Sequence, residues 1–265
     1  MLFNFCLYLL TGAVMGGLSG LLGIGGSIIS TPCLAWLFIK QGMPLSLYMH
    51  MAEGTSMAAI FVTGLMSVFF HHRRKLAIWP IYRQLLLGIL LGTLLGALVA
   101  YHLSSEQLHS IFSVFMFGFG LYMLLSKEPK VKRVLPGWLY LLPISMGIGT
   151  VSGLLGIGGG LLTIPFLHFY QVPMRQAVAV SVACASTIAL FGGALFIMLG
   201  LQQTGLPSFS SGYVYWPAFT GLVLVSPLFA YYGVELSHRL PAHVLKRGFA
   251  LLLLVVGFYM AWGFK

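Results

Sequence analysis

The chain has 265 residues, of which 59% are hydrophobic and only 7% are charged. Soluble domains carry about a quarter charged residues, so this composition excludes a water-soluble globular protein. The formal net charge of +10 is typical of the basic loops that orient membrane proteins, and we do not expect nucleic-acid binding. We therefore predict an all-α polytopic membrane protein within the lipid bilayer.

The first apolar segment spans 5–39 and contains the phrase "SGLLGIGGS" at 19–27, followed by Pro32. The segment lacks a basic start and a small-residue cleavage site, so we do not expect a removable signal peptide. Its clustered glycines and the proline predict a helix that breaks inside the bilayer. Three earlier glycines are spaced by four residues, which indicates close packing of two helices: Gly12, Gly16 and Gly20.

The second segment, 45–70, carries Glu53 about eight residues from its start. At the helical rise this places the carboxyl group ~12 Å deep, where ionisable side chains are costly and face an interior cavity. One interpretation is a protonation site, with His50, that couples proton flux to transport. The other is a carboxyl group hydrogen-bonded to His50 or to a broken helix end. Further apolar segments follow at 78–101 and 108–126.

The second half repeats the first. "SGLLGIGGG" at 152–160 lies 133 residues after its copy, and from "WP" at 79–80 a constant offset of 137 aligns the remaining segments. We predict two transmembrane repeats, 1–128 and 137–265, joined by a basic cytoplasmic linker at 129–136. Such internal repeats are typical of secondary transporters. The segments of the second repeat span 137–170, 173–200, 214–236 and 244–264.

The basic residues decide between two topologies. If each glycine-containing segment crosses the membrane once, the halves are parallel and basic residues fall on both sides. If the segment is a hairpin that returns to its starting side, the halves are inverted, and twelve of the fourteen basic residues lie on one side. We therefore expect inverted-topology repeats with both termini outside, without deciding whether the hairpin limbs cross fully. The twelve are Arg73, Arg74, Lys75, Arg83, Lys127, Lys130, Lys132, Arg133, Arg175, Arg239, Lys246 and Arg247.

Inverted repeats would bring the two glycine turns together near the middle of the membrane. The helices that leave these turns would present free N–H groups and positive dipole ends to a shared cavity, which suits a small anion. Close helix packing is the alternative explanation of such glycines. The candidate substrate-binding residues in the two turns are Gly25, Gly26, Ser27, Gly158, Gly159 and Gly160.

The duplicated motifs "GGLSGLLGIGGSIISTP" and "GTVSGLLGIGGGLLTIP" resemble the sulfite exporter TauE/SafE family over essentially the whole chain. "AEGTS" at 52–56 and "AVAVS" at 177–181 correspond to the small-residue helix that follows each motif in the family. The resemblance implies a bacterial inner-membrane transporter of sulfur-containing anions such as sulfite, sulfoacetate or other organosulfonates, with both termini then periplasmic. Ser27 replaces the usual glycine and the second small-residue helix lacks G-T-S, so we expect two inequivalent half-sites.

Other polar residues extend the candidate site. Ser56 and Ser181 can donate to sulfonate oxygens, or they can bond back to their own helices. Arg175 occupies the position that matches His50, and it can attract an anion from the cytoplasmic side or snorkel to lipid phosphate.

The sequence has no nucleotide-binding motif and no aspartate, so we expect no enzyme, cofactor or metal site. We expect an exporter coupled to an ion gradient. The alternatives are a passive anion channel with re-entrant hairpins, or a transporter of thiosulfate or a carboxylate. The oligomeric state is not indicated.

Overall fold

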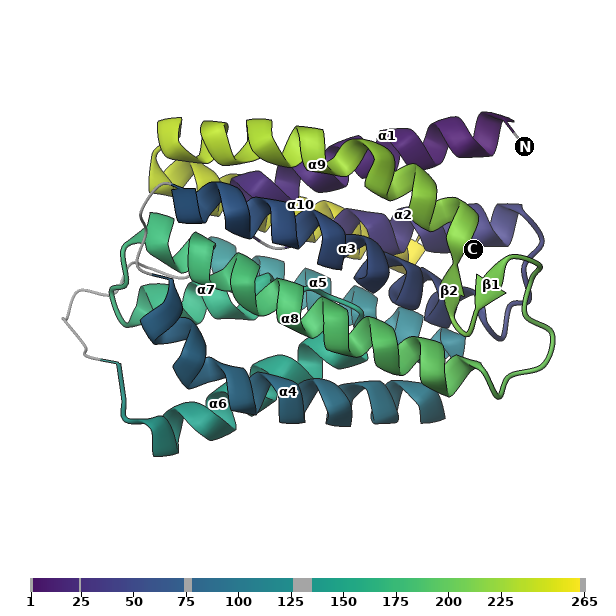
Figure 1. Cartoon of the computed structure of the whole chain (residues 1–265), viewed down its shortest axis with the longest axis horizontal. Coiled ribbons are helices and arrows are strands. Elements are labelled where there is room, and N and C mark those ends of the chain that lie inside the picture. The colour runs from purple at the N-terminus through teal and green to yellow at the C-terminus, as the bar shows by residue number, and fades with distance from the viewer. Residues whose placement is uncertain (1, 24, 74–77, 126–134, 263–265) are drawn as a thin grey trace.

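The computed structural model describes residues 2–23, 25–73, 78–125 and 135–262, and Figure 1 shows the chain as a bundle of long helices. Most of the predicted linker 129–136 lies outside the described residues. The helices of the first half are α1 (Leu2–Leu22), α2 (Ser27–Lys40), α3 (Tyr48–Arg73), α4 (Trp79–His102) and α5 (Ser105–Leu125). Those of the second half are α6 (Trp138–Leu154), α7 (Gly160–Phe169), α8 (Met174–Gly200), α9 (Trp216–Arg239) and α10 (Ala242–Trp262). Strands β1 (Ser210–Ser211) and β2 (Val214–Tyr215) form a hairpin between α8 and α9.

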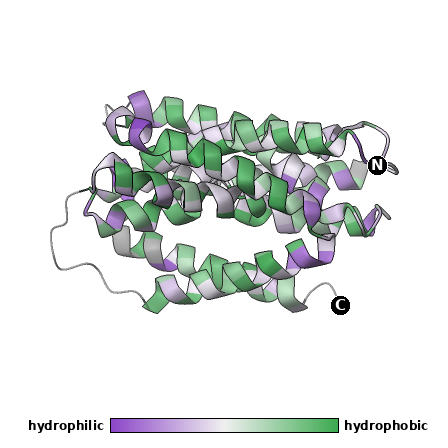
Figure 2. Ribbon diagram, turned by 90° about the horizontal axis from the view of Figure 1, so that it is seen from below, coloured by the Kyte–Doolittle hydropathy of each residue, from purple (hydrophilic) through white to green (hydrophobic). Residues whose placement is uncertain are grey.

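The predicted class, a polytopic α-helical membrane protein, is confirmed. Six of the described helices are long and apolar enough to cross a membrane, and shorter apolar helices accompany them. Large apolar side chains such as Val114, Leu224 and Val255 are exposed on the outer surface, where lipid tails would cover them. Figure 2 shows hydrophobic residues along the helices and hydrophilic residues gathered near their ends.

Each half packs its first helix against the other half. Gly12 and Gly16 of α1 lie directly against the backbone of Leu222 and Ser226 in α9, so the two helices run parallel in close contact. The predicted close packing of these glycines is therefore confirmed, because a Cβ at either position would overlap the α9 backbone. Helices α4 and α6 make the equivalent parallel contact through Gly88, Gly92 and Gly96.

The remaining central pairs join corresponding helices of the two halves. In α3 and α8, Gly64 contacts Ser186 and Gly192 contacts Met57, so these helices run antiparallel. Helices α5 and α10 are antiparallel as well, as the contact of Gly257 with Phe117 and the packing of Gly120 on Leu253 show. These two pairs of corresponding helices therefore run in opposite directions, while the inverted-topology repeats and their orientation in a membrane stay a prediction.

The two ends of the bundle differ in charge. The end of α3 at Arg73, the start of α8 at Arg175 and the end of α9 at Arg239 lie at one end, called the basic end below (Figure 1). The opposite end, called the hairpin end, carries Lys40, the β1–β2 hairpin and both chain termini (Figure 1). Six of the predicted basic-side residues, in 74–77 and 126–134, lie outside the described residues.

Candidate functional site

Both glycine phrases break the helix where the sequence predicts it. Gly25 and Gly26, between α1 and α2, have φ angles of 77° and 79°. Gly156 and Gly159, between α6 and α7, have φ angles of 62° and 65°. Left-handed backbone of this kind is readily adopted by glycine alone, since a Cβ would clash with the following carbonyl group. We call Gly23, Gly25 and Gly26 the first turn and 155–159 the second turn.

The limbs of the two hairpins have unequal lengths. Helix α1 has 21 residues, so it spans about 32 Å and matches the hydrocarbon core of a bilayer. Helix α7 has 10 residues and spans about 15 Å, or half that thickness. The second limb of the second hairpin is thus too short to cross a bilayer by itself.

The two turns meet inside the bundle. A Cβ built on Gly25 would lie 3.3 Å from the Cα of Gly158, and Ile60 of α3 and Ala185 of α8 flank this contact. Ser27 Oγ accepts a hydrogen bond of 3.2 Å from the Gly158 amide. The turns are therefore side by side as expected, but in this conformation no space for an anion remains between Gly25 and Gly158.

The other glycines of the candidate site stabilise each turn separately. Gly26 is the residue before α2 and packs against Met15 of α1. Gly159 precedes α7 and faces Ile188 of α8, and the Gly160 amide donates to Gly158 O at 2.7 Å. These three residues do not reach across to the opposite turn.

Ser181 and Ser56 occupy corresponding positions but have different partners. Ser181 Oγ donates to Gly23 O at 2.7 Å, so it links α8 to the first turn. Ser56 is fully buried, and its hydroxyl has no hydrogen-bond partner among the described residues. Neither serine bonds back to its own helix, whereas Thr163 does so by donating to Gly159 O. The Ser56 hydroxyl is thus available to another group.

Glu53 lies against the second turn. Its Cβ and Cγ pack on Gly156, as the corresponding Val178 packs on Gly23 in the first turn. The side chain is fully buried, and neither carboxyl oxygen has a hydrogen-bond partner among the described residues. The alternative interpretation is a carboxyl group hydrogen-bonded to His50 or to a broken helix end. Neither bond is present among the described residues. A buried carboxyl group without a partner is rare and points to binding or proton transfer.

His50 is engaged elsewhere. Its Nε2 lies 3.1 Å from Ala100 O, and its Nδ1 lies 3.2 Å from Ser105 Oγ, so it joins α3 to α4 and α5. Because a carbonyl oxygen only accepts, Nε2 donates to Ala100 O. The ring of Tyr213 from the β1–β2 hairpin stacks on the imidazole, with centroids 5.1 Å apart. His50 therefore closes the hairpin end instead of contacting Glu53.

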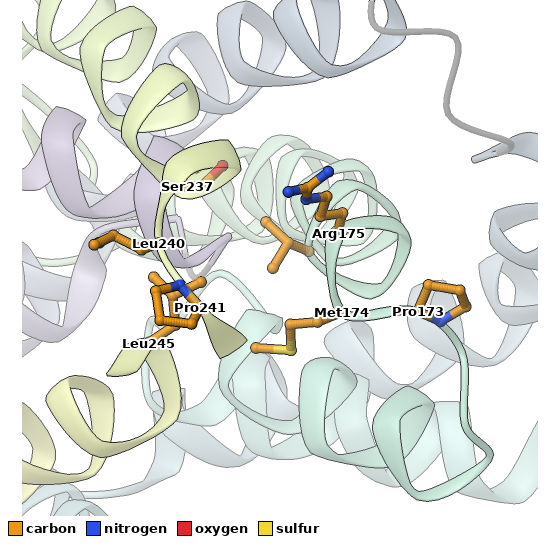
Figure 3. Close-up of a pocket in the computed structure, with 8 residues that line it drawn as sticks. Pro173, Met174, Arg175, Ser237, Leu240, Pro241 and Leu245 are labelled. Atoms are coloured by element: carbon orange, nitrogen blue, oxygen red, sulfur yellow. The ribbon is translucent and has the colours of Figure 1, made fainter. Parts of the chain in front are cut away.

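Arg175 lies away from the turns, in the first turn of α8 at the basic end. It lines a cavity of about 340 Å³ between the start of α8 and the corner that joins α9 to α10. Figure 3 shows the Arg175 guanidinium group and Ser237 on one side, with Met174, Pro241 and Leu245 across from them. Val178 also lines this cavity and packs against Gly23, so the cavity leads from the basic end to the first turn. We call it the basic vestibule.

The sequence interpretation missed the β1–β2 hairpin and its contacts. The Tyr215 amide donates to Thr55 Oγ1 at 3.0 Å, and the Tyr213 backbone lies against Gly54 and Gly200. The available signal was "SSGYVY" at 210–215, where Ser-Gly precedes alternating valine and tyrosines. Among the described residues, no group of three or more His, Cys, Asp or Glu side chains could hold a metal ion.

The chain is similar to a known protein family and to several proteins over nearly its whole length. The family model described as "Sulfite exporter TauE/SafE" matches residues 8–260. A "Probable membrane transporter protein" of Haemophilus influenzae is 34% identical over 265 residues, which cover 98% of this chain and 99% of the relative. A protein of the same description from Methanocaldococcus jannaschii is 28% identical over 96% of this chain and 94% of its own length. The Bacillus subtilis "Probable membrane transporter protein YunE" is 24% identical, covering 96% of both chains. No solved structure matches the chain.

Proposed function

The chain belongs to the sulfite exporter TauE/SafE family, and we propose that it is a secondary transporter of small sulfur-containing anions. Sulfite, sulfoacetate and other organosulfonates are the proposed substrates, exported across the bacterial inner membrane with both termini periplasmic. The observation that carries this proposal is the contact of the two glycine turns inside the bundle, together with a basic vestibule that reaches Val178 beside Gly23. The family description and the transporter names of the relatives support it.

The proposed path begins at the basic end. Arg175 at the mouth of the basic vestibule would attract an anion, and the Ser237 hydroxyl lies on the same wall. The other residues of the wall are apolar and offer an anion no further hydrogen-bond donors from their side chains. At the inner end of the vestibule, the Val178 side chain lies between the cavity and Gly23 of the first turn.

The proposed substrate site lies between the turns. Helices α2 and α7 both start there without a side-chain cap, so their positive dipole ends favour a negative charge. When the turns separate, the Gly158 amide leaves Ser27 and becomes a donor for an anion oxygen. The buried Ser56 hydroxyl is a further donor. Ser181, bound to Gly23 O, would keep the first turn in shape.

Glu53 is the proposed coupling residue. Its carboxyl group is buried beside the second turn without a partner among the described residues, and it can take up a proton when the anion moves. Proton movement through Glu53 would link the gradient to the opening of the turns. In this conformation His50 is not part of the coupling site, because its ring bonds to α4 and α5.

The closed contact of Gly25 with Gly158 favours a transporter over a passive channel. A permanently open channel would show a continuous pore here, whereas alternating access requires a conformation in which the site is closed. The substrate is tested by counterflow in proteoliposomes preloaded with sulfite, sulfoacetate, thiosulfate or a carboxylate. We expect labelled sulfite to enter transiently against unlabelled sulfite or sulfoacetate. Counterflow that only a carboxylate supports would contradict the proposed substrate class.

A further inference from the structure

The residues of the basic vestibule have counterparts at the hairpin end. Helices α3 and α8 correspond with an offset of 125, since Ile60 and Ala185 occupy equivalent places beside Gly25 and Gly158. The α4–α5 corner corresponds to the α9–α10 corner with an offset of 137. The counterparts of Met174, Arg175, Val178, Leu240 and Leu245 are therefore Met49, His50, Glu53, Leu103 and Leu108.

These counterparts are packed shut, whereas the basic vestibule is open. Arg175 is exposed at its mouth, but the side chain of His50 is only 4% exposed. The His50 ring occupies the space between α3 and the α4–α5 corner and bonds to Ala100 O and Ser105 Oγ. Ser105 Oγ in turn donates to Ser46 O at 2.7 Å, so the connection before α3 is held as well.

The β1–β2 hairpin covers this closed region from outside. Tyr213, only 3% exposed, stacks on His50 and makes an edge contact with Phe196 of α8 at 6.1 Å. The Tyr215 amide donates to Thr55 Oγ1 of α3. The hairpin is thus attached to both central helices at the end opposite the basic vestibule (Figure 1).

We propose that the hairpin ends of α3, α4 and α5 hold a second substrate vestibule, which His50 and Tyr213 close in this conformation. The inference rests on the proposed function, because its ligand is the same small sulfur-containing anion. When the hairpin lifts, Met49 and Glu53 form the wall of the second vestibule, as Met174 and Val178 form that of the basic vestibule. The imidazole of His50 then has the position in the second vestibule that the Arg175 guanidinium group has in the basic vestibule.

The second vestibule gives Glu53 a defined route to one side of the membrane. Glu53 lies one helical turn beyond His50 on α3 and rests on the second turn. Its counterpart Val178 already lines the open basic vestibule. A coupling ion would therefore reach Glu53 from the hairpin end, while the anion reaches the first turn from the basic end.

The test measures accessibility of Met49 with a membrane-impermeant maleimide applied to the hairpin end of reconstituted protein. The parent variant carries Met49→Cys and has Cys6, Cys33 and Cys184 replaced by alanine. We expect Tyr213→Ala to speed labelling by about tenfold, because the aromatic contacts of Tyr213 with His50 and Phe196, which hold the closed state, are lost. Tyr213→Phe keeps the stacked ring and should label like the parent variant.

A disulfide provides the opposite perturbation. Thr55→Cys with Tyr215→Cys, placed where the Tyr215 amide contacts Thr55 Oγ1, is designed to crosslink the hairpin to α3, and the oxidised variant should suppress labelling of Met49→Cys. The matched control, Ser210→Cys with Tyr215→Cys, joins the two strands within the hairpin and should leave labelling unchanged. Equal labelling of Met49→Cys in the Tyr213→Ala and parent variants, or in the two oxidised disulfide variants, would overturn the second vestibule.

The readout separates this inference from the proposed function. Labelling needs no substrate, so a second vestibule can be detected even if the protein moves no sulfite. Sulfoacetate at millimolar concentration is then added to the parent variant as a probe, because sulfite itself would react with the maleimide. A change in the labelling rate supports the vestibule as part of the anion path, whereas an unchanged rate overturns the assignment of its ligand.

Discussion

Gly25 and Gly158 lie 133 positions apart in the sequence and contact each other at the centre of the bundle, where a Cβ on Gly25 would lie 3.3 Å from the Cα of Gly158. Each belongs to one copy of the same glycine phrase. The contact joins two helix breaks, and a hydrogen bond from the Gly158 amide to Ser27 Oγ crosses it. The proposed substrate path requires this contact to open.

Larger side chains at the contact should abolish transport. Gly25→Leu forces a side chain against Ile60 in a left-handed backbone conformation, and we expect a loss of about 1–3 kcal/mol in stability together with transport. Gly118→Ala is the control, because a Cβ at Gly118 of α5 would meet no atom within 4 Å. Thermal unfolding and proteoliposome flux measure both effects. Unimpaired flux in Gly25→Leu would remove the turns from the path.

Ser27→Ala should loosen the closed state without destroying the fold. Loss of the bond to the Gly158 amide removes about 0.5–1.5 kcal/mol from the conformation in which the turns touch. We expect a lower Tm in the absence of substrate and a smaller difference after sulfite is added, since the open state needs no such bond. Ser110→Ala, at an exposed position of α5, is the matched control. A uniform Tm decrease with and without sulfite would contradict this role.

Arg175→Ala should raise KM for sulfite by about tenfold with a smaller change in kcat, because the guanidinium group acts at the mouth of the vestibule and not at the turns. Added salt should raise KM of the parent protein more than that of the variant. Arg239→Ala is the control at the same end, where Arg239 is exposed and pairs with Glu235 at 3.1 Å. Equal effects of the two variants would indicate a general effect of surface charge.

Glu53→Gln should make transport insensitive to an imposed pH gradient while leaving substrate binding intact. The amide of glutamine is nearly the same size as the carboxyl group, but it does not take up or release a proton. Glu106→Gln, at an exposed position in the first turn of α5, should leave the gradient dependence unchanged. Retained dependence in Glu53→Gln would exclude Glu53 as the coupling residue.

A reporter fused after Lys265 tests the membrane orientation. Both termini lie at the hairpin end, away from Arg73, Arg175 and Arg239 (Figure 1). The positive-inside rule therefore predicts a periplasmic C-terminus. Alkaline phosphatase activity in the fusion, with an inactive fluorescent-protein fusion at the same site, is the expected result. The reverse pattern would contradict the proposed orientation.

Features that depend on local composition could be predicted from the sequence. Long apolar runs gave the spans, the glycine phrases gave the breaks, and the spacing of Gly12, Gly16 and Gly20 indicated close helix packing. Membrane helices obey these rules closely because the bilayer forces each backbone group to bond within its own segment.

Contacts across the interface of the halves could not be predicted in the same way. Whether Ser27 bonds to Gly158, or His50 to Ser105, depends on distances that only the assembled bundle sets. The bond of Glu53 to His50, one of the two interpretations of the buried carboxyl group, is absent among the described residues, where the His50 ring nitrogens contact Ala100 O and Ser105 Oγ instead. The hairpin was overlooked because two strands of two residues leave almost no periodic pattern.

We propose that the chain moves a sulfur-containing anion through the contact of Gly25 with Gly158, driven by an ion gradient. Labelled sulfite accumulation in proteoliposomes with an imposed pH gradient tests it most directly, with Gly158→Leu as the blocked variant. We predict saturable accumulation above the external concentration in the parent protein, abolished by Gly158→Leu and by collapse of the gradient. Unsaturable equilibration that ignores the gradient, or full accumulation by Gly158→Leu, would contradict the account.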